Sequence, residues 1–500
     1  MKKIFYLKWS LLPLVVLLIG ISSCKKDFLD RQPLGRYIDE DVPAGSFDSK
    51  VFALYSLLRT DGFNSIHYLA IHSFRSDESE KGSTQADGAN HGQMYDDFQY
   101  DKSNGLLQTY WTNHYAVIIA ANAIIDDIDS IGATDQNTLI NKAEAKFLRA
   151  YAFFHLVRSF GEVPLVDFKI TDAAQVNIPK STSNEIFALI DQDLMEATSV
   201  LPESWDAQYT GRLTKGAALT LQAKTHLWRN NWAAALTSAK SVIALNKYGL
   251  VSNYGSQFRH TGENGPESIF EIQAIFRPAL DLGIPYANVQ GVRGAGSWDL
   301  GWGWNVPTQN LVDEYETGDP RKDATILYSG QTDPLFGETL PPQPTIARPY
   351  WNKKIYTNPA DRVALNSRFG RWMNHRIFRY ADVLLMAAEA ANELGGTQNT
   401  TDALAWLEMV RARARGNNNA ILPPVTTTDQ DELRQAIRHE RFVELAMEES
   451  RFWDLVRWGI DITVLPASGS PGYQLKHRLL PIPQEEIDKS GGILVQNPNY

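Results

Sequence analysis

Residues 141–166, NKAEAKFLRAYAFFHLVRSFGEVPLV, constrain the fold more than any other stretch of the chain. Their apolar side chains recur at helical spacing and form a stripe broad enough to be covered on two sides. Gly161 and Pro164 end the predicted helix, because glycine favours a helix C-terminus and proline cannot continue the hydrogen bonding. A long helix covered on two sides needs helical neighbours, so the stretch predicts a mainly α core and a structural role. The stripe consists of Ala143, Phe147, Ala150, Tyr151, Phe154 and Val157, widened by Leu148, Ala152 and Leu156.

Two helical hairpins are predicted far apart in the sequence. Each joins two helices through a short turn and places two alanines twelve positions apart, where the helices must approach closely. This spacing is typical of tetratricopeptide (TPR) repeats. We therefore predict a TPR-like helical scaffold over about 106–250 and 376–460, with the helices of 141–200 stacked against the hairpins. The hairpins are 216–228 with 232–245, containing Ala223 and Ala235, and 380–394 with 401–413, containing Ala391 and Ala403.

The N-terminus has the pattern of a bacterial lipoprotein. Lysines at the start, an apolar run and small residues before Cys24 match an export signal with a lipoprotein cleavage site. The apolar run is too short to span a membrane. Cys24 is the only cysteine, so a disulfide within the chain is excluded. We predict a signal peptide at 1–23, lipidation of Cys24, a tether at 24–40 and a single domain at 41–500.

Charge argues against a nucleic-acid partner. The formal net charge is −10, and removal of the signal, which contains three lysines and no acids, makes it −13. No basic stripe is present that would neutralise a phosphate backbone. The composition suits a body that is held at a membrane by lipid rather than by charge.

In two segments, the apolar residues do not recur at a regular helical or strand spacing. Residues 251–375, between the hairpins, are rich in Gly, Pro, Trp and Tyr and contain one alternating strand at 267–273. We expect them to form a loop-rich, irregular subdomain. Residues 71–103 are polar and too long for a simple connector, which suggests a functional loop.

Three tryptophans separated by glycines, Trp298, Trp302 and Trp304, are the sharpest candidates for a binding site. Glycine lets the backbone turn freely, so that indoles can be displayed at the surface. Sugar rings present apolar C–H faces that pack on flat aromatic rings, while polar neighbours bind the hydroxyls. The alternative is that some of these tryptophans only cover the core. The polar candidates are Arg293, Asp299 and Asn305.

The 75–100 segment supplies a second set of candidates. Tyr95, Phe98 and Tyr100 are predicted as further platform residues for a ligand. The same segment carries Asp77, Glu78, Glu80 and Asp87, whose oxygens are of the kind that calcium takes. The spacing of a calcium-binding EF-hand loop is absent, so a solvated acidic loop is the preferred interpretation and no metal site is predicted.

Signatures of enzymes and cofactors are missing from the sequence. It contains no G-x-S-x-G, no H-E-x-x-H, no P-loop and no G-x-G-x-x-G beside a strand. We predict neither a catalytic activity nor a cofactor. Two carboxylates across a cleft suffice to cleave a glycan, so that activity stays open as an alternative.

Six segments together resemble the SusD/RagB family, nutrient-binding lipoproteins of the Bacteroidetes outer membrane. The resemblance covers essentially the whole mature chain, and its motifs are long and occur in order. Most of them belong to the scaffold and therefore do not specify a ligand. The segments are 141–166, ESIFEIQ at 267–273, PTQNLVDEYETGDPR at 307–321, IRHERFVELAMEESRFWDLVRWG at 437–459, LPIP at 480–483 and QNPNY at 496–500.

The resemblance implies a SusD-like fold and a function. It implies a lipid-anchored protein on the outer membrane, facing the cell exterior, with its ligand site in the variable loops. It also implies a SusC-like TonB-dependent transporter as partner, to which the protein delivers an oligosaccharide. A peptide or glycopeptide ligand and a glycan-cleaving enzyme are the alternatives.

Overall fold

α-Helices make up most of the computed structural model, which describes residues 47–277 and 280–500. The prediction of a mainly α fold is confirmed. The predicted signal peptide, Cys24 and the tether lie outside the described residues. Within the described ranges, no helix combines the length and apolar character needed to cross a membrane.

The stretch that dominates the sequence forms the C-terminal part of α8 (Gln136–Phe160), and every residue from Ala143 to Phe160 is buried. The helix ends at Gly161, whose φ of 74° is unfavourable for other residues. Both α7 (Gly105–Ser130) and α9 (Ser183–Val200) pack against it, which supplies the helical neighbours that the sequence requires.

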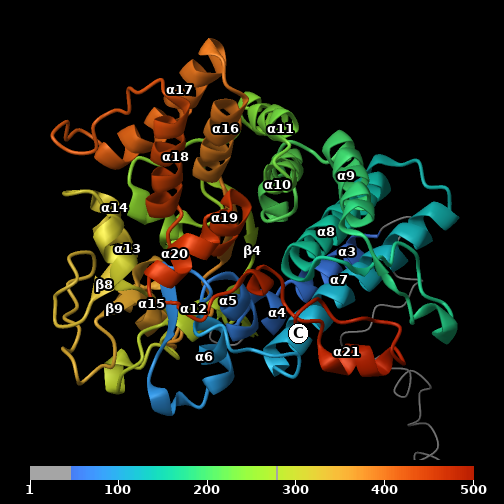
Figure 1. Ribbon diagram of the computed structural model, residues 1–500, viewed down its shortest axis with the longest axis horizontal. Helices are drawn as coiled ribbons and strands as arrows, with labels where there is room; N and C mark the ends of the chain where they lie inside the picture. Colours follow the sequence, from blue (N-terminus) through green and yellow to red (C-terminus); the bar gives the residue numbers. More distant parts are fainter. Residues whose placement is uncertain (1–46, 278–279) are drawn as a thin grey trace, which may run out of the picture. The chain divides into compact units, whose positions relative to one another are not determined.

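A series of packed helices continues from α9 across the molecule. α9 contacts α10, α11 contacts α16, and both predicted hairpins are present. Figure 1 shows these helices following one another from α7–α9 through α10 and α11 to α16–α18. The four alanines of the hairpins are fully buried, as expected for close helix contacts. The hairpins comprise α10 (Lys215–Trp228) with α11 (Trp232–Ala244) and α16 (Tyr380–Leu394) with α17 (Thr397–Arg415).

Buried ion pairs join α18 (Gln430–Glu444) to the rest of the fold. The Glu444 carboxylate accepts hydrogen bonds from Arg379 at 2.6 Å, from Arg321 at 3.0 Å and from Arg413. Burial alone would raise the pKa of Glu444, but the three guanidinium groups outweigh it and lower the pKa to about 2. These arginines come from three different elements, so one carboxylate fastens the helix to the loop-rich segment and to the second hairpin.

One prediction about this region is wrong. In the sequence, Arg441, Glu444, Glu448 and Arg451 are spaced by three and four residues, which predicts pairing along one helix face. In the structure, α18 ends at Glu444 and α19 (Arg451–Trp458) begins separately. The backbone between them turns through left-handed φ angles, which breaks the helical spacing. Their side chains instead hold partners from distant elements: Arg441 holds Asp382 and Asp454, Glu448 holds Arg379 and Lys354, and Arg451 holds Asp77.

The strands of the described chain form two-stranded antiparallel sheets. β1 (Ser79–Gly82) pairs with β7 (Trp304–Pro307), so the 75–100 segment lies beside the tryptophan cluster. A small separate core of the loop-rich segment surrounds Trp351. The remaining pairs are β2 (Val163–Pro164) with β3 (Lys180–Ser181), β4 (Ser268–Ile272) with β10 (His375–Arg379), β5 (Ile275–Arg277) with β6 (Leu280–Leu282), and β8 (Ile326–Tyr328) with β9 (Tyr350–Asn352).

The 71–103 segment is not the solvated acidic loop that the sequence suggests. It contains β1 and α6 (Asn90–Asp96), and most residues from 73 to 83 are buried. Its charges are neutralised within the fold: Asp77 accepts from Arg451 at 2.7 Å and Lys81 pairs with Asp87 at 2.8 Å. Paired and hydrogen-bonded charges can be buried, and sequence composition alone does not reveal the partners.

Candidate functional site

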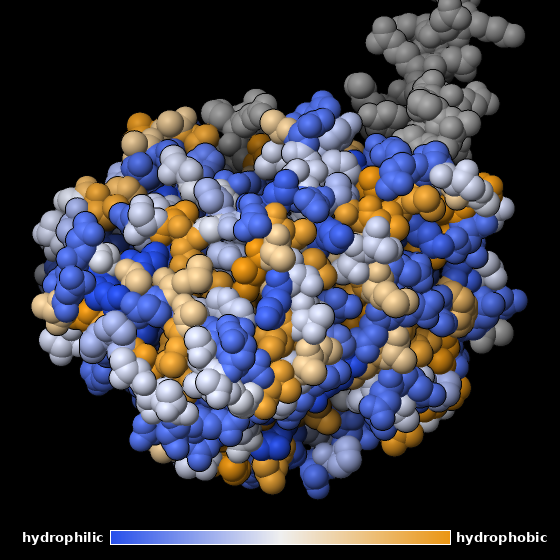
Figure 2. Space-filling model, turned by 90° about the horizontal axis from the view of Figure 1, so that it is seen from above, coloured by the Kyte–Doolittle hydropathy of each residue, from blue (hydrophilic) through white to orange (hydrophobic). Residues whose placement is uncertain are grey.

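Hydropathy does not by itself single out a binding surface. On the face seen in Figure 2, hydrophobic residues are interspersed among hydrophilic ones. The candidate site is therefore built from the geometry of the tryptophan cluster, from the polar cleft beside it and from the two strands, β1 and β7, that connect them.

Backbone contacts hold the segment from Gly291 to Trp302 tightly folded. It follows the short helix α12 (Tyr286–Gln290) and folds back on it, with the Trp302 N–H donating to the Asn288 carbonyl at 3.1 Å. A Cβ added at Gly301 would lie 2.1 Å from that same carbonyl, so only glycine allows this approach. The glycines thus serve close backbone packing, and the indoles are presented from a fixed loop.

Trp302 and Trp304 form an aromatic platform at the surface. Their rings stack at 5.5 Å with 18° between planes, and Trp302 is 40% exposed. The Trp304 indole N–H donates to Asp87 at 2.9 Å. Burial tends to raise the pKa of Asp87, but hydrogen bonds from Lys81, Ala89 and Trp304 outweigh it and lower the pKa. An ionised carboxylate paired with a buried lysine therefore fixes the orientation of Trp304.

Trp298 and two of the polar candidates have structural partners. Trp298 packs on the small core around Trp351. Asp299 pairs with Arg368 at 2.8 Å. Asn305, which was predicted as a surface candidate, is instead fully buried and donates to Gln290 at 2.8 Å. The reason is a left-handed turn at Asn305, with φ of 56°, which directs the side chain inward.

The second aromatic set is buried and cannot serve as a surface platform. Tyr95, Phe98 and Tyr100 are between 0% and 4% exposed. Tyr95 stacks on Tyr100 at 4.7 Å, and Phe98 meets Tyr473 edge to face at 4.9 Å. Tyr95 lies on α6, and Phe98 and Tyr100 follow it into the core. The contact of Phe98 with Tyr473, near the C-terminus, is one that local sequence does not reveal.

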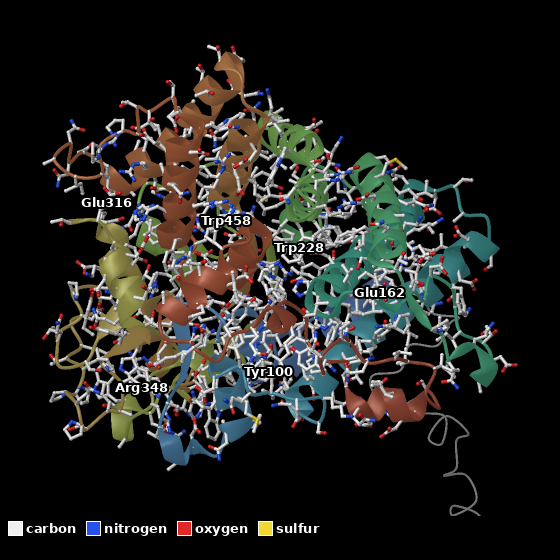
Figure 3. The ribbon with its side chains drawn as sticks, in the orientation of Figure 1. Tyr100, Glu162, Trp228, Glu316, Arg348 and Trp458 are labelled. Carbon is white, nitrogen blue, oxygen red and sulfur yellow. The ribbon has the colours of Figure 1, made fainter. Side chains whose placement is uncertain are left out.

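A polar cleft of about 540 Å³ adjoins β1 and β7. Arg348 lies on its wall, donating to Glu80 at 3.0 Å and to the backbone carbonyls of Ser83 and Gly82. Because Gly82 pairs with Trp304, Arg348 connects the cleft to the edge of the aromatic platform. Figure 3 labels Arg348 among the loops beside the segment that contains α6. Other polar lining residues include Gln93, Asp96, Asp97, Thr308, Gln309, Asn310 and Tyr350.

Asp96 is the most unusual of the cleft residues. Burial raises the pKa of its carboxyl well above the ordinary range, against one hydrogen bond from the Lys81 N–H that lowers it. Its second oxygen, Oδ1, is buried and has no hydrogen-bond partner in the described ranges. The desolvated environment of this carboxyl thus opposes its ionisation, while its partner Lys81 N–H favours it.

The acidic residues of 77–87 are engaged by protein groups. Asp77 pairs with Arg451, and Glu80 pairs with Arg348. Asp87 pairs with Lys81, and Glu78 accepts a hydrogen bond from the Met447 N–H. Over residues 47–277 and 280–500, no group of three or more potential ligands converges on a metal position.

Sequence reasoning missed the cleft residues Gln309, Asn310, Arg348 and Tyr350. Gln309 and Asn310 belong to the PTQN motif, which was assigned to the scaffold from the sequence alone. This motif is the sequence signal by which the two residues could have been found. Tyr350 donates its hydroxyl to Gln309 at 2.6 Å, and Asn310 donates to the Asp77 backbone carbonyl at 3.3 Å. The sequence around Arg348 gives no indication of its position, because its partners lie in and just after β1, far away in the chain.

Comparison with known proteins identifies the family. A model described as "SusD family" matches residues 266–475, and one described as "Starch-binding associating with outer membrane" matches residues 27–227. The chain belongs to the SusD family. This SusD-family chain is 28% identical to the "SusD-like protein P2" of Formosa agariphila, over 97% of its own length and 98% of that protein.

Solved structures of SusD-like proteins share its fold. A "Laminarin binding SusD-like protein" matches with a TM-score of 0.75 at 27% identity, covering 91% of this SusD-family chain and 98% of the other. The surface glycan-binding protein A from Bacteroides thetaiotaomicron, solved with laminarihexaose, matches with a TM-score of 0.76 at 23% identity, covering 91% and 99%. The SusD-like fold predicted from the sequence is therefore confirmed.

Proposed function

We propose that the protein is a glycan-binding lipoprotein of the outer membrane. It takes an oligosaccharide at the cell surface and delivers it to a SusC-like TonB-dependent transporter. The observation that carries the proposal is the exposed Trp302, stacked on a Trp304 that Asp87 holds in place beside a polar cleft.

The chemistry of this surface suits a sugar. A flat indole packs against the apolar face of a sugar ring, and this adds roughly 0.5–1.5 kcal/mol beyond the area buried. The adjoining cleft offers amides and hydroxyls that match ring hydroxyls. Family membership supports the same conclusion, because one relative is named for binding laminarin and one family model for binding starch at the outer membrane.

Alanine substitution of Trp302 tests the proposal. We expect Trp302→Ala to weaken glycan binding tenfold or more, about 1.4 kcal/mol, with little change in the melting temperature. Trp351→Ala is the contrast, because Trp351 is fully buried and its loss should destabilise by about 3–5 kcal/mol. Affinity and stability are measured on the same samples by calorimetry and thermal unfolding.

Other outcomes would reject the proposal. Normal affinity in a stable Trp302→Ala would place the site elsewhere. Tight binding of peptides with none of glycans would favour the peptide-binding alternative. New reducing ends after incubation with the glycan would show cleavage, and the protein would then be an enzyme.

A further inference from the structure

Arg293 is an arginine beside the platform that has no acidic partner. Within the described ranges, its side chain forms neither an ion pair nor a hydrogen bond and instead lies over an aromatic ring. Other arginines of the loop-rich segment do hold carboxylates: Arg348 that of Glu80, Arg362 that of Glu338 and Arg368 that of Asp299.

The guanidinium of Arg293 lies over the exposed tryptophan. Its Cζ is 4.8 Å from the centroid of the Trp302 ring. When a guanidinium stacks on an aromatic ring, its flat face contacts the ring, and its N–H groups, which lie in the guanidinium plane, stay available to other acceptors. Since no group within the described ranges accepts a hydrogen bond from Arg293, its donors are available beside the surface on which a sugar ring would pack.

Backbone packing at Gly303 brings Arg293 close to the aromatic platform. A Cβ added at Gly303 would lie 2.6 Å from the Cβ of Arg293 and 2.8 Å from the Trp351 ring, so glycine at 303 allows Arg293 to approach the platform. The acids near the platform are already neutralised, since Asp87 pairs with Lys81 and Asp299 with Arg368. The charge of Arg293 is thus uncompensated locally, although the chain as a whole carries −10.

We propose that the glycan bound at this surface is acidic, and that Arg293 binds its negative group while the sugar ring packs on Trp302. A uronate carboxylate and a sulfate ester both present the oxygen pair that a guanidinium fork recognises. The inference rests on the proposed glycan binding at the platform and adds the chemical class of the ligand.

The experiment measures binding by the purified protein in three arms. Polygalacturonate and alginate represent uronates, carrageenan and sulfated fucan represent sulfate esters, and laminarin, starch and xylan represent neutral glycans. Each arm is measured with the native protein, Arg293→Gln, Arg293→Lys and Lys240→Gln. Lys240 lies on α11 with a 54% exposed side chain, so its variant changes the net charge equally at a distant site. Melting temperatures are recorded for every sample.

We expect at least one acidic glycan to bind more tightly than every neutral one. Arg293→Gln should weaken that binding tenfold or more, Arg293→Lys less, and Lys240→Gln not at all. Raising the salt above about 0.1 M should weaken binding in the native protein more than in Arg293→Gln. Whether the uronate or the sulfate arm responds identifies the anionic group.

Two results would overturn the inference and are distinguishable from each other. If a neutral glycan binds as tightly as any acidic one, or if Arg293→Gln binds the acidic glycan normally, the ligand class is wrong and the proposed function survives. If no glycan of any arm binds, the proposed function fails and the inference fails with it.

Discussion

Buried histidines show how single residues set the response of this protein to pH. His72, His114 and His155 lie in the core between α5 (Ile66–His72), α7 and α8. The Nδ1 of His72 accepts from the Trp453 indole N–H at 2.8 Å, so it cannot carry a proton. Burial, as the largest cause, lowers the pKa of all three, and that of His114 to about 3.

Acid is therefore expected to destabilise the fold below pH ~6.5, the ordinary histidine pKa in the unfolded chain. Below pH ~6.5 the unfolded state binds more protons than the folded state. The contribution of these histidines to the free energy of unfolding is therefore fully present above that pH, and it decreases as the pH falls toward the folded pKa of His114, about 3. At pH ~5, His114 alone should contribute a loss of about 2 kcal/mol, since one pKa unit is about 1.4 kcal/mol. Urea unfolding across this range measures the slope.

A histidine variant isolates this effect. His114→Gln should flatten the dependence between pH ~6.5 and ~5, whereas His260→Gln, at a side chain 47% exposed, should not. An unchanged slope in His114→Gln would contradict the assignment. The ion pairs of Glu444 respond in a separate range, because its pKa of about 2 places their loss below pH ~4.5.

The helical hairpins can be tested at the scale of whole elements. Ala235 is fully buried on α11, which packs on α10 and on α16, and Ala233 on the same helix is exposed. Ala235→Leu should destabilise by about 1–3 kcal/mol, because added methylene groups overpack a close helix contact. Ala233→Leu should change stability little. Both melting temperatures and the glycan affinity of the folded protein are compared, and affinity should be equal in the two variants.

A hairpin without close contact would behave differently. If Ala235→Leu melts at the native temperature, the two helices do not meet tightly at this position. If affinity falls in Ala235→Leu but not in Ala233→Leu, the scaffold is coupled to the binding surface instead of only supporting it.

The proposed display on the membrane concerns the whole molecule. The sequence predicts lipidation of Cys24, which lies outside the described residues, and acyl chains contribute about 0.8 kcal/mol per buried methylene. Cys24→Ala should therefore remain unprocessed or leave the membrane fraction. Fractionation of the outer membrane, followed by protease treatment of intact cells, measures both location and exposure. A variant that stays anchored and protease-accessible would refute the lipid anchor.

Much of the fold is readable from the sequence because its signals are local. The stripe in 141–166 and the paired alanines of both hairpins depend only on helical spacing, and the structure forms helices at each position. Glycine and proline mark the end of α8 for an equally local reason. Trp302 was identified as a binding candidate by its glycine-rich surroundings, and whether it binds a ligand stays a prediction.

Tertiary structure alone decided which side chains are buried and which charges are paired. Tyr95 and Asn305 look like surface residues in sequence, but the folded chain buries both. The partners of Glu444 lie up to 123 residues away, so helical spacing could not indicate them. The unpaired guanidinium of Arg293 is recognisable only in the folded structure, where the neighbouring arginines form ion pairs with carboxylates. Local periodicity thus determined the helices, whereas burial and ion pairing, which depend on contacts between remote segments, determined which residues form the candidate site.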